Sequence, residues 1–206
     1  GELGAGVAHE INNPLAAVLG AAQLALLRID KQDTRVRAHL HNAERAYSEG
    51  RYSDAAASFL AADRLQPTPA LQLALGKTYE QMNDPSHALA SYREYFVRAP
   101  RAADRAQVQA RVTVLAAQLA EKGIQQISIS SVPRGATVVI DAKPLGTTPI
   151  YVDLSPGSHH VEFHRHGYES AGLDFELSAQ QPLNVMTTFA SPRKSRRMSS
   201  LMVPRA

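Results

Sequence analysis

Residues 50–67, GRYSDAAASFLAADRLQP, and residues 83–100, NDPSHALASYREYFVRAP, repeat one pattern at an offset of 33 positions. The offset aligns the small residues Ala55 and Ala88, the aromatic residues Phe59 and Tyr92, and finally Pro67 and Pro100. A small residue lets two helices approach closely, an aromatic one fills the space beside it, and a proline ends a helix. The repeat therefore predicts a stack of helical hairpins, each burying its apolar face against the next.

This spacing resembles the tetratricopeptide repeat (TPR), with units over residues 36–68 and 69–101. Gly76 and Tyr79 fit the first helix of the second unit, and the turn signal Asn83-Asp84-Pro85 separates its two helices. Helical spacing continues from 102 to 122 and stops at Gly123, which predicts a capping helix. The resemblance implies a helical domain over 36–122 whose concave groove binds a protein partner. The alternative is a spacer that holds two other parts apart.

From Ile127 onward the apolar residues alternate with a period of two, which is typical of β-strands. Turn signals separate short strands, beginning with Pro133-Arg134-Gly135-Ala136 and continuing at Gly146 and Gly157. This order resembles the PEGA domain over residues 126–188, with Arg134 in place of the usual Glu. The resemblance implies a small antiparallel β-sandwich or sheet of five or six strands, without catalytic residues, that binds a cell-envelope ligand. A turn is expected over residues 142–146.

The N-terminal segment 7–15, VAHEINNPL, opens a run of apolar residues at helical spacing. Pro14 is expected to kink this helix because it lacks a backbone N–H. The segment resembles the H-box of sensor histidine kinases, over residues 1–30. The resemblance implies that His9 is the phosphoacceptor, that Glu10 orients its ring as general base, and that Asn13 positions water. It also implies a response regulator or a kinase as partner at His9, and a homodimer. The alternative is a plain helix with one exposed histidine.

Two features set the segment apart from a complete kinase. No second bundle helix is recognisable unless the first repeat helix takes its place. The family's glycine-rich ATP motif is also missing, because the only Gly-x-Gly is Gly4-Ala5-Gly6. We therefore expect no cofactor and no autophosphorylation. His9 is then a substrate of another kinase or a relic of a fusion.

Residues 159–166, HHVEFHRH, place His160, Glu162, His164 and His166 on one face of the expected strand. A His-x-His pair is able to share a zinc ion. An amphipathic strand needs a polar face opposite Val161 and Phe163 in any case. We interpret these side chains as that solvated face and predict no metal.

The net charge of +3 is concentrated in the last 17 residues. Residues 190–206 contain five basic side chains and no acid, which leaves −2 for the rest of the chain. This tail is expected to be disordered, and the near-neutral remainder gives no sign of a specific nucleic-acid site. The chain has no Cys, so disulfides and thiolate metal sites are excluded.

The sequence thus predicts an α+β multidomain protein with a helical N-terminal part and a β-domain. The leading hypothesis is a bacterial signalling or scaffold protein that is not itself an enzyme. The alternatives are a truncated sensor histidine kinase that passes phosphate from ATP through His9 to a regulator, and an extracytoplasmic envelope or adhesion component. We expect a cytoplasmic location, or an envelope location if a secretory signal precedes Gly1.

Overall fold

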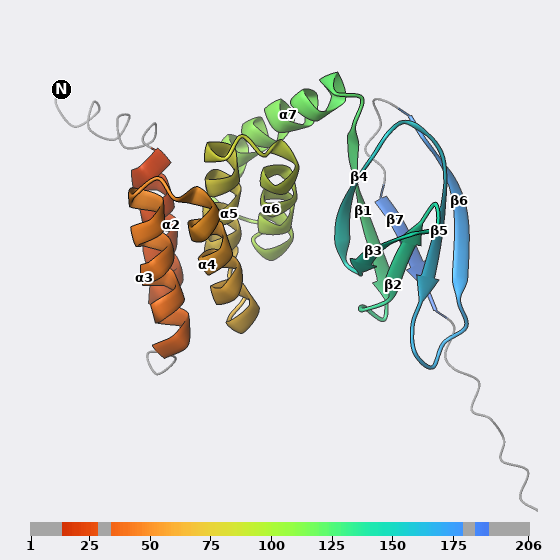
Figure 1. Cartoon of the computed structure of the whole chain (residues 1–206), viewed down its shortest axis with the longest axis horizontal. Helices are drawn as coiled ribbons and strands as arrows, with labels where there is room; N and C mark the ends of the chain where they lie inside the picture. The colour runs from red at the N-terminus through yellow and green to blue at the C-terminus, as the bar shows by residue number, and fades with distance from the viewer. Residues whose placement is uncertain (1–13, 29–33, 179–183, 190–206) are drawn as a thin grey trace, which may run out of the picture. The chain divides into compact units, whose positions relative to one another are not determined.

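The computed structural model describes residues 14–28, 34–178 and 184–189. The chain divides into two compact units, Gly1–Gln126 and Ile127–Ala206. The described part contains six helices and seven strands (Figure 1), which confirms the α+β class. The basic tail lies outside the described residues.

The first unit is helical. Its elements are α2 (Pro14–Arg28), α3 (Thr34–Ser48), α4 (Tyr52–Leu65), α5 (Pro69–Gln81), α6 (Pro85–Arg98) and α7 (Arg105–Glu121). Helices α3 and α4 pack as one hairpin and α5 and α6 as a second, with α7 against α6. The expected kink at Pro14 falls on the boundary of the described residues.

The ends of these helices follow from side chains that the sequence signals. Thr68 caps α5 by accepting a hydrogen bond from the Leu71 N–H, and Asp84 caps α6 by accepting one from the His87 N–H. Asn83 has φ +54°, the left-handed conformation that ends α5. The turn predicted at Asn83-Asp84-Pro85 is therefore present. Gly123 likewise follows α7 with φ +68°.

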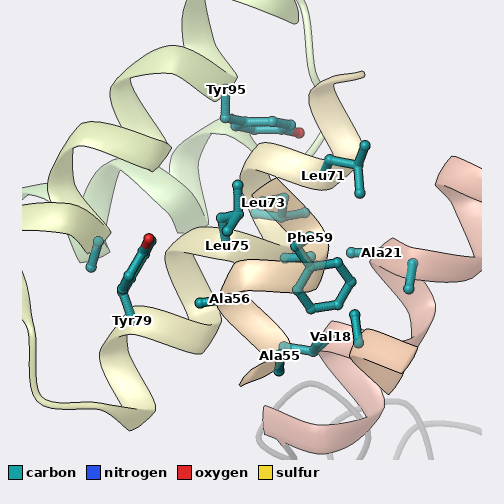
Figure 2. Close-up of a cluster of buried hydrophobic side chains, with 14 of the residues drawn as sticks. Val18, Ala21, Ala55, Ala56, Phe59, Leu71, Leu73, Leu75, Tyr79 and Tyr95 are labelled. Atoms are coloured by element: carbon teal, nitrogen blue, oxygen red, sulfur yellow. The ribbon is translucent and has the colours of Figure 1, made fainter. Parts of the chain in front are cut away.

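The repeated residues lie in one buried core. Ala55, Ala88 and Phe59 are fully buried, and Tyr92 is 1% exposed. Figure 2 shows Phe59 in the same cluster as Val18 and Ala21 of α2. Helix α2 contacts both α5 and α3, so it closes one face of the hairpin stack.

The second unit contains seven strands in two sheets. Its strands are β1 (Gln125–Val132), β2 (Thr137–Ile140), β3 (Lys143–Thr147), β4 (Ile150–Leu154), β5 (Gly157–His164), β6 (Ala171–Leu177) and β7 (Asn184–Thr188). One sheet has the order β3-β2-β5-β6 and is antiparallel, and the other has the order β4-β1-β7. Residues of both sheets contribute to a single buried core, including Ile127, Ile129, Val138, Val161 and Phe163.

Three expectations for this unit were wrong. The described residues contain seven strands rather than five or six, and β1 pairs in parallel with β7. Turn signals describe only consecutive strands, whereas this pair joins strands far apart in the sequence. The turn expected over 142–146 is a two-residue turn at Asp141 and Ala142, with φ of +48° and +63°, so that residues 143–147 form β3.

Candidate functional site

The predicted phosphoacceptor group, His9, Glu10 and Asn13, lies outside the described residues. What the structure describes is helix α2, which begins directly after it at Pro14. Val18, Ala21, Ala22 and Ala25 on this helix are at most 3% exposed and belong to the core of the first unit. The helix that follows the H-box is therefore anchored to the hairpin stack by one face.

The opposite face of α2 is open and mostly apolar, with Gln23 as an exposed polar residue on it. Leu24 is 55% exposed, and Ala16, Leu19 and Gly20 are partly exposed. A helix with exposed leucine beside small residues often has that face covered by another element or chain. The open face is thus a candidate contact surface.

The first unit also holds a cavity of about 190 Å³. Helix α2 contributes Ala17 to its wall, α5 contributes Leu73, Lys77 and Glu80, and the start of α7 contributes Val108 and Arg111. Four elements therefore converge on one space, because Tyr92 of α6 also lines it. We call this space the Lys77 cavity.

Lys77 is the most unusual group of the cavity. Its Nζ donates to the carbonyl oxygen of Ala17 at 3.5 Å, and no ion pair involves it within the described residues. Burial lowers the pKa of Lys77, although the nearby carboxylates of Asp104 and Glu80 act in the opposite direction. The ammonium group is therefore incompletely compensated.

The two carboxylates of the cavity are held by phenols. The Tyr92 hydroxyl donates to Glu80 Oε1, and Arg111 Nη1 donates to Glu80 Oε2 at 3.1 Å. The Tyr95 hydroxyl donates to Asp104 Oδ1. Burial, together with these carboxylates, raises the pKa of both tyrosines. Both phenols thus stay protonated at neutral pH and fix the carboxylates in place.

The charged residues of the Lys77 cavity were not predicted from the sequence. One signal was present, since Lys77 is the only basic residue of the otherwise largely apolar helix α5. Asp104 and Arg111 belong to a region that was expected only to cap the stack. Their convergence depends on how α5, α6 and α7 pack, which the repeat pattern does not specify.

In the second unit, the histidine-rich strand has the polarity that was predicted. His160, Glu162 and His164 lie opposite the buried residues Val161 and Phe163. His166 lies in the loop after β5 instead of on the strand. Glu162 interacts with both histidines of this polar face, at 3.0 Å from His164 Nε2 and 3.8 Å from His160 Nε2. No group of three suitable side chains in the described ranges is arranged to hold a metal ion.

His159 has a structural position beside this face. Its Nδ1 lies 2.7 Å from Asp141 Oδ2, and its Nε2 lies 2.8 Å from the carbonyl oxygen of Ser155. Burial disfavours the charged ring, but these two acceptors outweigh burial and raise the pKa of His159. Both ring nitrogens act as donors when the ring is protonated, so the imidazolium ties the β2–β3 turn to β5.

Two segments of the chain match known family models. Residues 1–49 match the His Kinase A (phospho-acceptor) domain, and residues 124–192 match the PEGA domain. These matches confirm the resemblances at both ends of the chain, whereas no match covers residues 50–123, which contain most of the helical repeats. Comparison with curated proteins and with solved structures gave no match. None of the described helices is long and apolar enough to cross a membrane.

Proposed function

We propose that this chain is a signalling scaffold that joins a phosphoacceptor helix to a protein-binding helical stack and to a β-domain that binds a cell-envelope ligand. The two family matches fit a signalling or envelope-associated protein. Helix α2, which follows the phosphoacceptor segment in the sequence, shares one core with the helical stack. Binding of a protein to the stack would therefore act on the phosphoacceptor helix within one core.

Helix α3 is the feature that supports this proposal most directly. The match to the phosphoacceptor domain extends to residue 49, and α3 ends at Ser48. Helix α3 is also the first helix of the first repeated hairpin, because it packs against α4. Helix α3 would thus serve both as the second helix of the phosphoacceptor hairpin and as the first helix of the stack.

We infer further that α3–α6 are two TPR-like repeats. The 33-residue offset and the buried positions Ala55, Ala88, Phe59 and Tyr92 support this. The core shared by the two sheets of the second unit likewise supports a β-sandwich.

At the phosphoacceptor, His9 would attack a phosphoryl group through one neutral ring nitrogen. Glu10 would hold the proton on the other nitrogen, as in the family that the segment resembles. Asn13 would position water for dephosphorylation of a response regulator. A partner kinase would bind ATP, so that the P–N bond to His9 forms as the bond between the β- and γ-phosphates breaks and ADP leaves.

The test is phosphorylation of the purified full-length chain. With labelled ATP alone we expect no label, and with an added histidine kinase we expect acid-labile label that the His9→Gln variant loses. His41→Gln, which changes an exposed histidine of α3, is the matched control and should be labelled like the wild type. Label with ATP alone would favour the truncated kinase instead, and label that survives His9→Gln would refute the assignment of His9.

The PEGA match favours an envelope-associated role as the second candidate. In that case the phosphoacceptor would have no use, because ATP and kinases are cytoplasmic. Cell fractionation of the full gene product separates the two, since an exclusively extracytoplasmic protein would exclude phosphotransfer.

A further inference from the structure

We propose that the Lys77 cavity binds a small zwitterion of the α-amino-acid class with an apolar side chain. The carboxylate of this ligand would bind to Lys77 and Arg111, and its ammonium group to Asp104. The described lining of the cavity consists of other residues than the predicted phosphoacceptor group, and ligand binding there does not depend on the proposed phosphotransfer.

The charges of the cavity point to a ligand that is neutral overall. Two cationic side chains, Lys77 and Arg111, and two anionic ones, Glu80 and Asp104, line the same space. A simple anion would meet the two carboxylates, and a simple cation would meet the ammonium and guanidinium groups. A ligand with one charge of each sign avoids both repulsions, because each of its ends is able to pair with the opposite charge.

The hydrogen-bonding groups of the cavity that have no partner in the described part of the chain also include both donors on cations and an acceptor on an anion. Within the described residues, the three N–H bonds of Lys77 serve only the long contact to Ala17, and Arg111 donates only the 3.1 Å hydrogen bond to Glu80. Asp104 accepts the Tyr95 hydroxyl through Oδ1, which leaves Oδ2 open. Glu80 uses both oxygens on Tyr92 and Arg111. The open groups are thus donors at Lys77 and Arg111 and an acceptor at Asp104.

The size and the remaining wall define the rest of the ligand. A volume of about 190 Å³ is below the roughly 300–1,000 Å³ of sites for drug-sized ligands. Leu73, Val108 and Ala17 add apolar surface to the wall. An aliphatic amino acid such as leucine matches both the volume and this surface.

The ligand would also act on helix α2. Ala17 lines the cavity and accepts the hydrogen bond from Lys77, so an occupied cavity would contact α2 directly. Because the ligand binds only the folded unit, it should raise the melting temperature of the chain.

The experiment uses the full-length chain and three related probes in isothermal titration calorimetry. L-Leucine carries both charges, N-acetyl-L-leucine lacks the ammonium group, and L-leucinamide lacks the carboxylate. We expect leucine to bind about tenfold to a hundredfold more tightly than either analogue, as the loss of a charge-assisted hydrogen bond predicts. Absence of leucine binding, or equal binding of all three probes, would overturn the proposal without bearing on His9.

Two charge-removing variants sharpen the test. Lys77→Gln should shift the preference towards leucinamide, and Asp104→Asn, which keeps an oxygen for Tyr95, should shift it towards N-acetyl-leucine. Lys122→Gln changes an exposed lysine outside the cavity and should bind like the wild type. Unchanged preference in both cavity variants would refute the site, and the three wild-type titrations decide the question even if a variant fails to fold.

Discussion

Gly76 of α5 lies directly against the ring of Tyr92 in α6. A Cβ atom added at Gly76 would lie 2.4 Å from Tyr92 Cε1 and 2.6 Å from Cδ1. The Tyr92 ring is 1% exposed and its hydroxyl is bound to Glu80, so the ring has little freedom to move away. Gly20 in α2 is the opposite case, because no atom of the described residues lies within 4 Å of the position that an alanine Cβ would take there.

We therefore predict opposite effects for two chemically identical changes. Gly76→Ala should lower the free energy of unfolding by about 1–3 kcal/mol, as overpacking of a core does. Gly20→Ala should raise it by roughly 0.5–1 kcal/mol, because alanine loses less backbone entropy in a helix. Urea denaturation of both variants measures these differences. A neutral Gly76→Ala would show that Tyr92 is not confined as described.

Thr148 has an equally specific position in the second unit. Ser131 Oγ donates to the carbonyl oxygen of Pro133 at 2.7 Å, so Thr148 Oγ1 must donate to Ser131 Oγ at 2.5 Å. Thr148 Oγ1 in turn accepts from the N–H groups of Gly135 and Ala136, at 3.1 and 3.0 Å. One buried hydroxyl thus connects two turns.

Thr148→Val should destabilise the second unit by about 1–3 kcal/mol, because it leaves the buried Ala136 N–H without its acceptor while keeping the side-chain shape. The Gly135 N–H keeps the Thr148 carbonyl oxygen as an acceptor at 2.9 Å. Thr148→Ser is the control because it retains the hydroxyl. It should lower the free energy of unfolding less than Thr148→Val, since only one methyl group is lost. Differential scanning calorimetry measures both. If valine and serine had equal effects, packing rather than hydrogen bonding would explain the position.

For single residues, the sequence predicted which side chains are buried better than it predicted which charged side chains meet in a site. Ala55, Ala88, Phe59 and Tyr92 are buried as the repeat implied, because spacing alone places them on the inner helix faces. The Lys77 cavity was missed, since its charged residues come from different helices and no single motif contains them.

At the scale of elements, the β2–β3 turn depends on contacts to β5. Asp141 is in the left-handed conformation, and its Oδ1 accepts from the His160 N–H at 3.0 Å while Oδ2 contacts His159. The hydrogen bond from His160, followed by that from His159, lowers the pKa of Asp141. A carboxylate and an imidazolium therefore hold the turn against β5.

This arrangement predicts a pH-dependent stability. The pKa of His159 is raised above its ordinary value of 6.5, so its stabilising effect is complete below pH 6.5 and is lost as the pH rises through the folded-state pKa. Raising the pH from about 6 to about 8.5 should therefore lower the melting temperature of the second unit, which is the calorimetric transition that Thr148→Val shifts. This pH range begins just below the ordinary pKa of histidine.

His159→Gln should reduce this pH dependence, because glutamine does not titrate. A part should remain, since the hydrogen bond to Asp174 raises the pKa of His160 as well. His166→Gln changes an exposed histidine of the loop after β5 and should keep the wild-type profile. A His159→Gln variant with an unchanged profile would show that another group causes the pH dependence. The opposite effect at low pH, from Asp141, begins only below its ordinary value of 3.8.

The elements themselves were predictable to different degrees. The helix boundaries followed from Pro67, Asn83 and Gly123, which act locally. The turn at Asp141 was misplaced because its conformation depends on β5, 18 or 19 residues further along. The parallel pairing of β1 with β7 has no local signal at all.

At the scale of the whole molecule, helix α2 has an inner apolar face that is buried and an outer face with exposed Leu24 and Gln23. Only the inner face is covered within the part of the chain that the structure describes. Val18, Ala21, Ala22 and Ala25 are buried against the stack. His Kinase A domains typically dimerise through their helices. Since the stack already covers the inner face of α2, a second copy would have to use the outer face, where Leu24 is 55% exposed.

We therefore predict that the full-length chain dimerises through the outer face of α2. Leu24→Glu should convert the dimer to a monomer, because a charge cannot be buried in an apolar contact without a partner. Val97→Glu is the matched control, since Val97 of α6 is 60% exposed and belongs to the other end of the repeat array. Size-exclusion chromatography with light scattering measures the mass of each protein. A monomeric wild type, or equal dissociation by both variants, would mean that the repeated hairpins have replaced the second copy and that the phosphoacceptor helix works in a single chain.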